Sequence, residues 1–230
     1  MSGERVSRRK PENYYEMLGD DFDNFMSDYD VERRLHLIKG LYPQAAAGPS
    51  LEVGCGTGAV TTSLLDMATD LMVTDLSAML AARVGRTHGI PWRDADANSL
   101  PFEDNSFGMV ISSECVEHTP DPGLGIREMI RVVRPGGYVV FTTPNRLWYP
   151  VVRGAQLARV RKYQGNEVFL SIRQMKEAVI MGGAVPEAVA GCHLFPWQIP
   201  ASKRVLRRLD KYGDRLHRLM INVGMRARKV

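Results

Sequence analysis

Two carboxylates and an imidazole stand close together in the segment 114–118, at Glu114, Glu117 and His118. The segment follows the apolar run 109–112, which is typical of a β-strand, and open α/β sheets bind ligands outside the carboxyl ends of their strands. A histidine has an unperturbed pKa of about 6.5, which suits a general base that removes a proton from a hydroxyl. Glu117 or Glu114 can orient the imidazole and raise its basicity. The spacing predicts proton-transfer chemistry, with His118 as the base and Glu117 as its catalytic partner.

A second set of candidate functional residues is the glycine cluster of the segment 51–58, which contains Gly54, Gly56 and Gly58. Glycines at the end of a strand let the backbone turn tightly and approach a ligand without an intervening Cβ atom. A tight strand-to-helix turn without a ligand is the structural alternative. Because the cluster lies in a repeated strand–helix pattern, it favours a ligand-binding turn.

The glycine cluster is compatible with two kinds of ligand. Gly54, Gly56 and Ala59 satisfy the G-x-G-x-x-G/A dinucleotide pattern, and Asp75 lies 21 residues after Gly54, where a ribose-binding acid is expected. Glu52 argues against a pyrophosphate at the helix N-terminus, because extra negative charge would repel that group. Its carboxylate can instead accept a hydrogen bond from a ligand ammonium or order the loop. This pattern alone does not decide between a dinucleotide and another nucleoside ligand.

Strand-like and helix-like patterns alternate along the chain and would position these segments. Apolar runs typical of strands occupy residues 50–53, 71–74, 109–112 and 138–142, and helical patterns follow at 77–83 and 125–133. After residue 145, helices are expected at 151–161 and 172–181, and strands at 185–194 and 220–225 on either side of a basic helix at 202–219. The alternation predicts an α/β fold with a parallel sheet covered on both faces.

The length of 230 residues suits one domain with four predicted parts. These are an N-terminal helical lid (1–45), a ligand-binding core (46–145), a substrate cap with the sixth strand (146–200), and a basic helix with the last strand (201–230). The cap is rich in aromatic residues, namely Trp148, Tyr149, Phe169, Phe195 and Trp197. They suit an apolar or ring-bearing ligand, or form the core of a small helical subdomain.

Several segments, in order, resemble the class I S-adenosylmethionine-dependent methyltransferases, nearest to the ubiquinone-pathway O-methyltransferases. The matching segments are 52–58, Asp75, 96–107 and 131–137, within a region that runs from about Arg34 to Asn145. The resemblance implies a single methyltransferase domain over residues 1–230. Its expected fold is a doubly wound, mostly parallel, seven-stranded sheet of Rossmann-like type, with N-terminal helices and a helical insertion after strand five.

The same resemblance implies S-adenosyl-L-methionine as the cofactor. Asp75 would accept hydrogen bonds from the ribose hydroxyls, and Asp96 would accept one from the adenine amino group. Arg34 stands where the quinone-pathway enzymes place an arginine against the cofactor, and a guanidinium suits the cofactor's carboxylate. A solvated helix face beside Glu32 is the alternative for Arg34. The implied cofactor contacts are Arg34, Glu52, Gly54, Cys55, Gly56, Gly58, Asp75, Leu76, Asp96, Ala97 and Ser113.

The E-x-x-E-H spacing also occurs in the quinone-pathway O-methyltransferases, where it is linked to a divalent cation. Carried over, Glu114, Glu117 and His118 become candidate ligands of Mg²⁺ or another divalent cation, which would lower the pKa of a substrate hydroxyl. A metal site, His118 acting as the base without metal, and a purely structural cluster are the three interpretations. His193 is either a remote fourth ligand or part of the packing.

The reaction implied is methyl transfer to a small-molecule or lipid-like acceptor, with oxygen as the expected methylated atom and His118 as the base. The alternatives within this chemistry are N- and C-methylation in natural-product or sugar metabolism. Two alternatives come from other functional classes. They are an NAD-dependent oxidoreductase and a non-catalytic module that only binds the cofactor.

Basic charge is concentrated in the last thirty residues. Residues 201–230 hold ten Lys or Arg and two Asp, whereas the first 200 residues carry 20 basic and 24 acidic side chains. The basic helix is expected to pack with a solvated face or to contact an anionic membrane surface peripherally. A nucleic-acid partner is disfavoured, because interleaved basic and aromatic repeats are missing. The three widely spaced cysteines, with no secretory signal or membrane-spanning run, predict a reduced, cytoplasmic protein.

Overall fold

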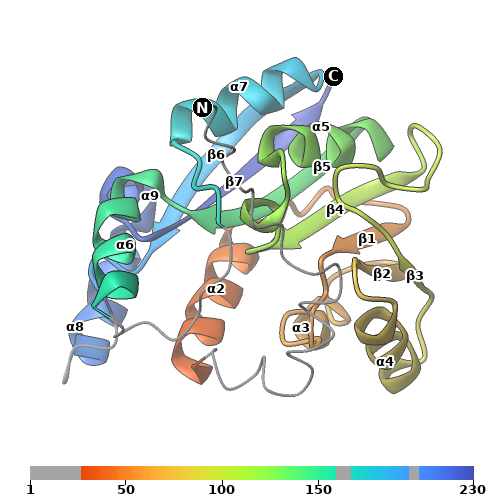
Figure 1. The fold of residues 1–230 in the computed structure, drawn as a ribbon. Helices are drawn as coiled ribbons and strands as arrows, with labels where there is room; N and C mark the ends of the chain where they lie inside the picture. The colour runs from red at the N-terminus through yellow and green to blue at the C-terminus, as the bar shows by residue number, and fades with distance from the viewer. Residues whose placement is uncertain (1–26, 159–166, 197–201) are drawn as a thin grey trace, which may run out of the picture.

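Seven strands form one sheet in the order β3-β2-β1-β4-β5-β7-β6 (Figure 1). The computed structural model describes residues 27–158, 167–196 and 202–230. Within them, the strands are β1 (Ser50–Val53), β2 (Leu71–Asp75), β3 (Trp92–Asp94), β4 (Phe107–Ser113), β5 (Val133–Pro144), β6 (Ala184–Cys192) and β7 (Asn222–Lys229). Strands β1 to β5 pair in parallel, and β7 runs antiparallel to both β5 and β6. The predicted mostly parallel, seven-stranded sheet is therefore confirmed.

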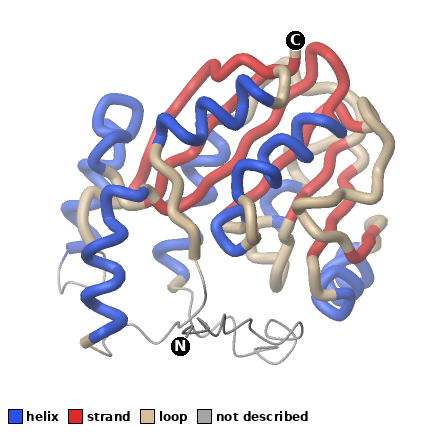
Figure 2. Tube along the Cα trace, turned by 45° about the horizontal axis from the view of Figure 1, so that its top comes forward, coloured by secondary structure: helices blue, strands red, loops and turns tan. Residues whose placement is uncertain are grey.

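Helices cover both faces of this sheet (Figure 2). They are α2 (Asp28–Leu41), α3 (Thr61–Leu64), α4 (Ala78–His88), α5 (Pro122–Val132), α6 (Tyr149–Leu157), α7 (Ile172–Met181), α8 (Ser202–Leu209) and α9 (Gly213–Leu216). Alternate residues of β4 point to opposite faces, as the two-residue repeat of a strand requires. Val110 packs in the core that contains α5 and α7, while Met109 and Ile111 pack in the core that contains α2, α3 and α4.

Strand β3 is not predicted from the sequence. All three of its residues are exposed, so it lacks the apolar run that marked the other strands. It is a strand because its backbone pairs with that of β2, and no local pattern in the sequence marks it. The predicted N-terminal helices before residue 27, the end of the predicted helix 151–161 and Trp197 lie outside the described residues.

The predicted continuous basic helix over 202–219 is wrong. The segment consists of α8, the 3₁₀ turn η4 (Asp210–Tyr212), the short α9 and the 3₁₀ turn η5 (His217–Leu219). Packing against β6 explains the breaks, because a Cβ atom at Gly213 would collide with the carbonyl oxygen of Gly191. The apolar side chains of this segment are only partly buried: Leu206 is fully enclosed, whereas Val205 and Leu219 are about half exposed. Within the described residues, no helix has the length and apolarity needed to cross a bilayer.

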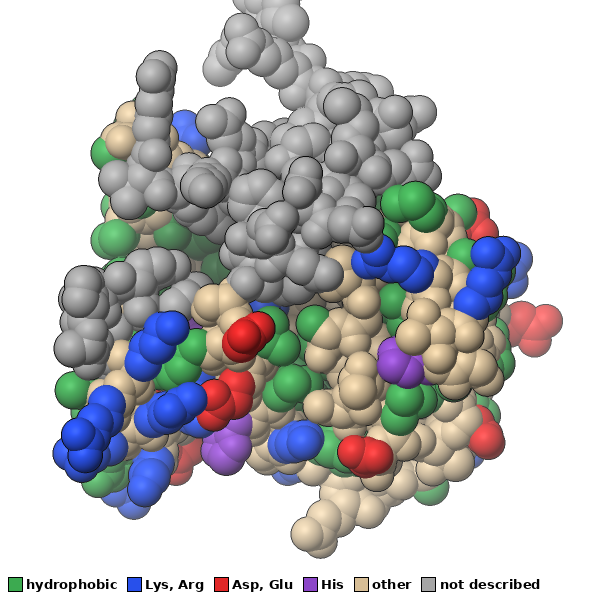
Figure 3. All heavy atoms as spheres, turned by 90° about the horizontal axis from the view of Figure 1, so that it is seen from below, with side chains coloured by type: hydrophobic (Ala, Val, Ile, Leu, Met, Phe, Trp, Pro, Cys, Tyr) green, Lys and Arg blue, Asp and Glu red, His purple; other side chains and the backbone are tan. Residues whose placement is uncertain are grey.

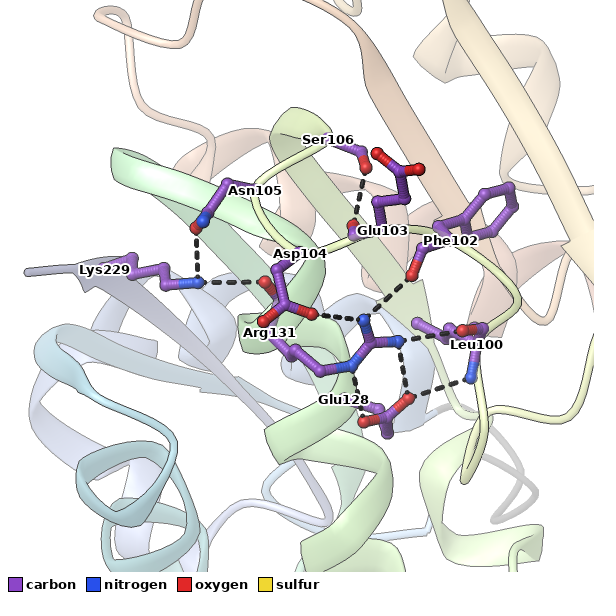
Figure 4. Close-up of polar contacts among 9 residues, drawn as sticks. All are labelled: Leu100, Phe102, Glu103, Asp104, Asn105, Ser106, Glu128, Arg131 and Lys229. Atoms are coloured by element: carbon purple, nitrogen blue, oxygen red, sulfur yellow. Dashed lines mark hydrogen bonds and ion pairs between the residues drawn. The ribbon is translucent and has the colours of Figure 1, made fainter.

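Arg131, near the end of α5, ties the connection between β3 and β4 to that helix (Figure 4). Its guanidinium donates to the carbonyl oxygens of Leu100 and Phe102, each at 2.8 Å, and to Asp104 Oδ1 at 2.7 Å. Two further contacts join it to Glu128, at 2.8 and 2.9 Å, and Glu128 accepts from the backbone N–H of Leu100. Arg131 therefore holds the segment 100–104, which follows the predicted adenine contact Asp96 along the chain.

We expect Arg131→Met to lower the free energy of unfolding by about 1–3 kcal/mol, because two backbone carbonyls and Glu128 lose a charged donor. In a chain of this size, each kcal/mol corresponds to about 2–4 °C in Tm. The control is Arg173→Met, which removes an ion pair with Glu177 from a side chain that is 87% exposed. That variant should stay within about 0.5 kcal/mol of the parent protein in thermal unfolding followed by circular dichroism. Equal losses in the two variants would contradict the role of Arg131.

Candidate active site and cofactor site

The glycine turn after β1 lies against the end of β4. The backbone N–H groups of Gly54 and Cys55 both donate to the carbonyl oxygen of Thr74, each at 2.9 Å, which fixes the turn on β2. Gly54 has a φ of +76°, and a Cβ atom there would collide with the side chain of Cys115. Only glycine combines this backbone conformation with so close an approach. The contact brings the glycine turn beside the acid–histidine segment.

Asp75, at the end of β2, links the glycine turn to the next helix. Its Oδ2 accepts from the backbone N–H of Gly56 at 2.8 Å, and its Oδ1 accepts from that of Ser77 at 2.9 Å. Burial raises the pKa of Asp75 despite these hydrogen bonds. Each carboxylate oxygen can accept a second hydrogen bond, so the side chain retains capacity for ligand hydroxyls. Leu76 and Met79 are 59% and 48% exposed beside it and offer an apolar surface.

Glu52 lies beneath the glycine turn. The residue is 2% exposed on β1, and its Oε2 accepts a hydrogen bond of 2.6 Å from Thr61 Oγ1 of α3. Burial raises the pKa of Glu52 to about 8, and the nearby charge of Asp75 adds to the shift. Of the two roles considered for Glu52, this contact supports ordering of the loop.

The remaining predicted cofactor residues differ in their environment. Asp96 is exposed, and its Oδ1 accepts from the backbone N–H of Asn98 at 2.8 Å. Ala97 is buried in the core that contains α5, so its side chain points away from a surface ligand. Ser113 Oγ lies 3.3 Å from Thr142 Oγ1 at the end of β4. Cys55 is buried, and burial raises the pKa of its thiol, which fits a space-filling role.

Glu117 and His118 lie in the 3₁₀ turn η2 (Val116–His118), just beyond β4. Glu117 is 1% exposed, and its Oε2 accepts from Thr143 Oγ1 at 3.1 Å. Its Oε1 lies 3.9 Å from His118 Nε2, which is an electrostatic contact rather than a hydrogen bond. Burial, reinforced by the charge of Glu114, raises the pKa of Glu117 well above its ordinary value. The predicted pair of acid and imidazole is thus brought together.

Glu114 turns toward a residue that sequence reasoning missed. Its Oε2 accepts a hydrogen bond of 2.7 Å from Asn222 Nδ2, at the start of β7. The two residues are 108 positions apart, and no local signal marks Asn222 as part of the site. Burial raises the pKa of Glu114 to about 7, while the positive charge of Arg34 opposes the shift.

Comparisons with known proteins agree with this geometry. A family model described as "Methyltransferase domain" matches residues 51–141, which contain the glycine turn and the acid–histidine segment. The ubiquinone biosynthesis O-methyltransferase of Bordetella avium is 26% identical over 71% of this chain and 73% of its own length. The malonyl-[acyl-carrier protein] O-methyltransferase of a Marinomonas species is 30% identical over 70% of this chain and 66% of its own length.

The chain belongs to the class I S-adenosylmethionine-dependent methyltransferases. A solved S-adenosylmethionine-dependent methyltransferase from Thermotoga maritima has the same fold, with a TM-score of 0.71 and 19% identity. The superposition covers 94% of this methyltransferase and 98% of that chain. Family membership leaves the dinucleotide-dependent oxidoreductase without support.

The residues of this methyltransferase fit S-adenosylmethionine. The bare Cα atoms of the glycine turn allow close approach of a ligand, and Asp75 keeps acceptor capacity for the ribose hydroxyls. Arg34 of α2 is 6% exposed, and its Nη2 lies 2.9 Å from Asp30 Oδ2. The solvated helix face considered for Arg34 is therefore wrong. Burial opposes its charge, but the carboxylates of Asp30, Glu114 and Glu117 raise the pKa of Arg34, so its charge belongs to the site.

The predicted metal site does not fit this methyltransferase. In the described part of the chain, no group of three or more His, Cys, Asp or Glu side chains is placed to hold a metal ion. The carboxylate of Glu114 is directed at Asn222 and that of Glu117 at Thr143, while His118 Nε2 lies 3.9 Å from Glu117 Oε1. The predicted ligand set Glu114, Glu117 and His118 is corrected for this reason. His193 is completely buried, with its Nε2 3.1 Å from Asp30 Oδ1, and belongs to the packing.

We expect Glu52→Gln to flatten the dependence of stability on pH. The ordinary pKa of 4.5 rises to about 8 in the fold, so between these values the folded chain binds a proton that the unfolded chain has lost. The stabilisation by this bound proton is complete below pH 4.5 and is lost as the pH rises through about 8. The variant keeps an acceptor for Thr61 and should match the parent Tm at pH 5 and exceed it at pH 8.5.

Thermal unfolding between pH 5 and 8.5 measures this difference. Glu103→Gln, at an exposed position, is the matched control and should leave the pH dependence of the parent protein unchanged. Parallel pH profiles for Glu52→Gln and the parent protein would show that Glu52 is not the group responsible.

Proposed function

We propose that this methyltransferase transfers the methyl group of S-adenosylmethionine to an oxygen atom of a small-molecule or lipid-like acceptor, with His118 as the general base. The observation that carries the proposal is the contact between Gly54 and Cys115, which sets the glycine turn against the segment that bears Glu117 and His118. Methyl transfer is a direct displacement, so the protein must align donor and acceptor and remove the proton of an acceptor hydroxyl. The roles proposed for the glycine turn and for His118 correspond to these two requirements.

The roles of the residues follow from their positions. The bound cofactor supplies an electrophilic methyl group. Asp75 would hold the ribose hydroxyls, and Arg34 would face the cofactor's carboxylate. The imidazole of His118 accepts the proton of the acceptor hydroxyl, and Glu117 lies beside the ring, with its Oε1 3.9 Å from Nε2. Oxygen is chosen because two similar proteins are named O-methyltransferases, one of ubiquinone biosynthesis and one of malonyl-[acyl-carrier protein].

We expect His118→Gln to lower kcat/KM by about 100- to 10,000-fold, the usual contribution of a general base. The affinity for S-adenosylhomocysteine should change less than about twofold, because the imidazole acts on the acceptor. Turnover is measured as formation of S-adenosylhomocysteine with each member of a panel of phenolic and acyl-carboxylate acceptors. The affinity for S-adenosylhomocysteine is measured by calorimetric titration. His36→Gln, on the exposed face of α2, is the matched control. Full turnover by His118→Gln on every acceptor of the parent protein would overturn the assignment.

We also propose that the segment α8–η5 contacts an anionic lipid surface. Figure 3 shows Lys and Arg side chains gathered on the side where α8 lies in Figure 1. In the same segment, Val205, Tyr212 and Leu219 are each about half exposed. Exposed apolar side chains among basic ones are the composition of an interfacial helix. Arg207 is already paired with Glu32, at 2.7 Å. The exposed basic residues of the segment are Lys203, Arg204, Arg207, Arg208, Lys211, Arg215 and Arg218.

Replacement of Arg204, Arg208 and Arg215 by Gln should weaken binding to phosphatidylglycerol vesicles by roughly 100-fold, at about 1 kcal/mol for each basic side chain. Co-sedimentation at two salt concentrations measures the effect. The control replaces three exposed basic residues elsewhere, Lys39, Arg86 and Lys176, and should bind as the parent protein does. Equal losses in both triple variants would point to net charge alone, and unchanged binding would remove the proposal.

A further inference from the structure

Two oxygen atoms of the site lack a hydrogen-bond partner within the described part of the chain. They are Glu114 Oε1 and Asn222 Oδ1, and both are buried. Asn222 as a whole is 5% exposed. A buried polar atom without a partner costs about 1–3 kcal/mol, which is why such atoms are rare in folded proteins. Two of them on adjacent side chains indicate a place for a hydrogen-bond donor from outside the described part of the chain.

The two side chains are held in a fixed orientation. Asn222 Nδ2 donates to Glu114 Oε2 at 2.7 Å, so the amide nitrogen faces the carboxylate and Oδ1 takes the other direction. The preceding residue of the chain anchors Asn222, because Ile221 donates its N–H to His193 at 2.8 Å and accepts that of Asn145 at 2.7 Å. The pair is therefore built into the sheet rather than carried on a free loop.

The backbone at Glu114 is strained in a way that positions its side chain. Its φ of +50° lies in the left-handed region, which costs a residue with a Cβ atom about 1–3 kcal/mol. The N–H of Glu114 donates to the carbonyl oxygen of Thr142 at 3.0 Å, and this bond holds the conformation. Strain of this kind persists where the surrounding structure imposes it, and it clusters at functional sites.

The pair extends away from the part of the site that would hold the cofactor's ribose. Asp75 ends β2 and Asn222 begins β7, and three strands (β1, β4 and β5) lie between β2 and β7 in the sheet. At about 4.8 Å for each step between neighbouring strands, these two residues are roughly 19 Å apart. Glu114 directly follows β4, as the segment of His118 does, and Asn222 lies two strands further from the ribose-binding acid, on β7.

The charge around the pair favours a cationic donor. Arg34 and Asp30, the charged groups that act on Glu114, form an ion pair of 2.9 Å with each other, so the carboxylate of Glu114 is the excess negative charge among the three. An ammonium group brings a positive charge and up to three N–H donors, enough to satisfy both unpartnered oxygens. A hydroxyl has only one hydrogen to donate and would leave one oxygen unsatisfied.

We propose that Glu114 and Asn222 bind an amino group of the acceptor, so that this methyltransferase selects amine-bearing acceptors. The inference rests on the proposed function, because it assumes that a small acceptor occupies the site beside His118. Glu114 Oε1 and Asn222 Oδ1 each accept one N–H of the amino group. The amino group is a recognition handle, and the methylated oxygen lies elsewhere on the same acceptor.

The test compares the binding of tyramine and 4-ethylphenol, which share a phenol and differ in the ammonium group. Binding to the full chain saturated with S-adenosylhomocysteine is measured by ligand-detected NMR and calorimetry. We expect tyramine to bind at least tenfold more tightly than 4-ethylphenol. Glu114→Gln and Asn222→Ser should each reduce this ratio to about one, while the control Glu187→Gln, a surface residue paired with Arg226, should preserve it.

Each outcome decides between defined alternatives. Equal binding of the two phenols to the parent protein, or a preference that survives in both variants, overturns the proposal. A loss of affinity for S-adenosylhomocysteine in Glu114→Gln would assign the pair to the cofactor's own ammonium and would also overturn it. Thermal unfolding establishes that the variants are folded, and two separate substitutions keep the test valid if one is unstable. Because the readout is binding, failure of methyl transfer or of the His118 assignment is detected separately.

Discussion

The approach of Gly54 to the side chain of Cys115 is the constraint on which the site depends. The glycine turn follows β1, and the segment that bears Glu117 and His118 follows β4. The two segments meet at this contact. A side chain larger than hydrogen at position 54 would force the two loops apart. Since β1 and β4 are neighbouring parallel strands, their carboxyl ends would still meet, but not at the separation that methyl transfer between two bound molecules requires.

A buried network of charges joins α2 to His193 and Asp210 in the C-terminal part of the chain. Arg34 pairs with Asp30, Asp30 meets His193, and Asp210 accepts from both Arg33 Nε and the backbone N–H of His193, each at 2.8 Å. Buried ion pairs add little net stability, because desolvation offsets most of their attraction. Their value here is orientation: they fix α2, and therefore the guanidinium of Arg34, relative to β6 and the basic segment that follows it.

Sequence patterns were sufficient wherever the relevant neighbours are close along the chain. The apolar runs before Gly54, Asp75 and Glu114 are short and buried on both faces, so the parallel core of the sheet could be predicted. Glu117 and His118 are consecutive residues, so their proximity is given by the sequence. Strand β3 has no apolar run that would predict it, since all three of its residues are exposed. The basic segment is shorter as a helix than its sequence predicts, and its close contact of Gly213 with Gly191 depends on residues far along the chain.

The sequence by itself determined the residue types of the cofactor turn and of the acid–histidine segment, since glycine conformations and short-range spacing are local properties. Tertiary structure decided which groups those side chains meet. The antiparallel strand β7 brings Asn222 to Glu114 across 108 positions, and this hydrogen bond draws the carboxylate away from a metal-binding arrangement. Burial then raises the pKa values of Glu114 and Glu117, because desolvation depends on what surrounds a carboxylate and not on its neighbours in the chain.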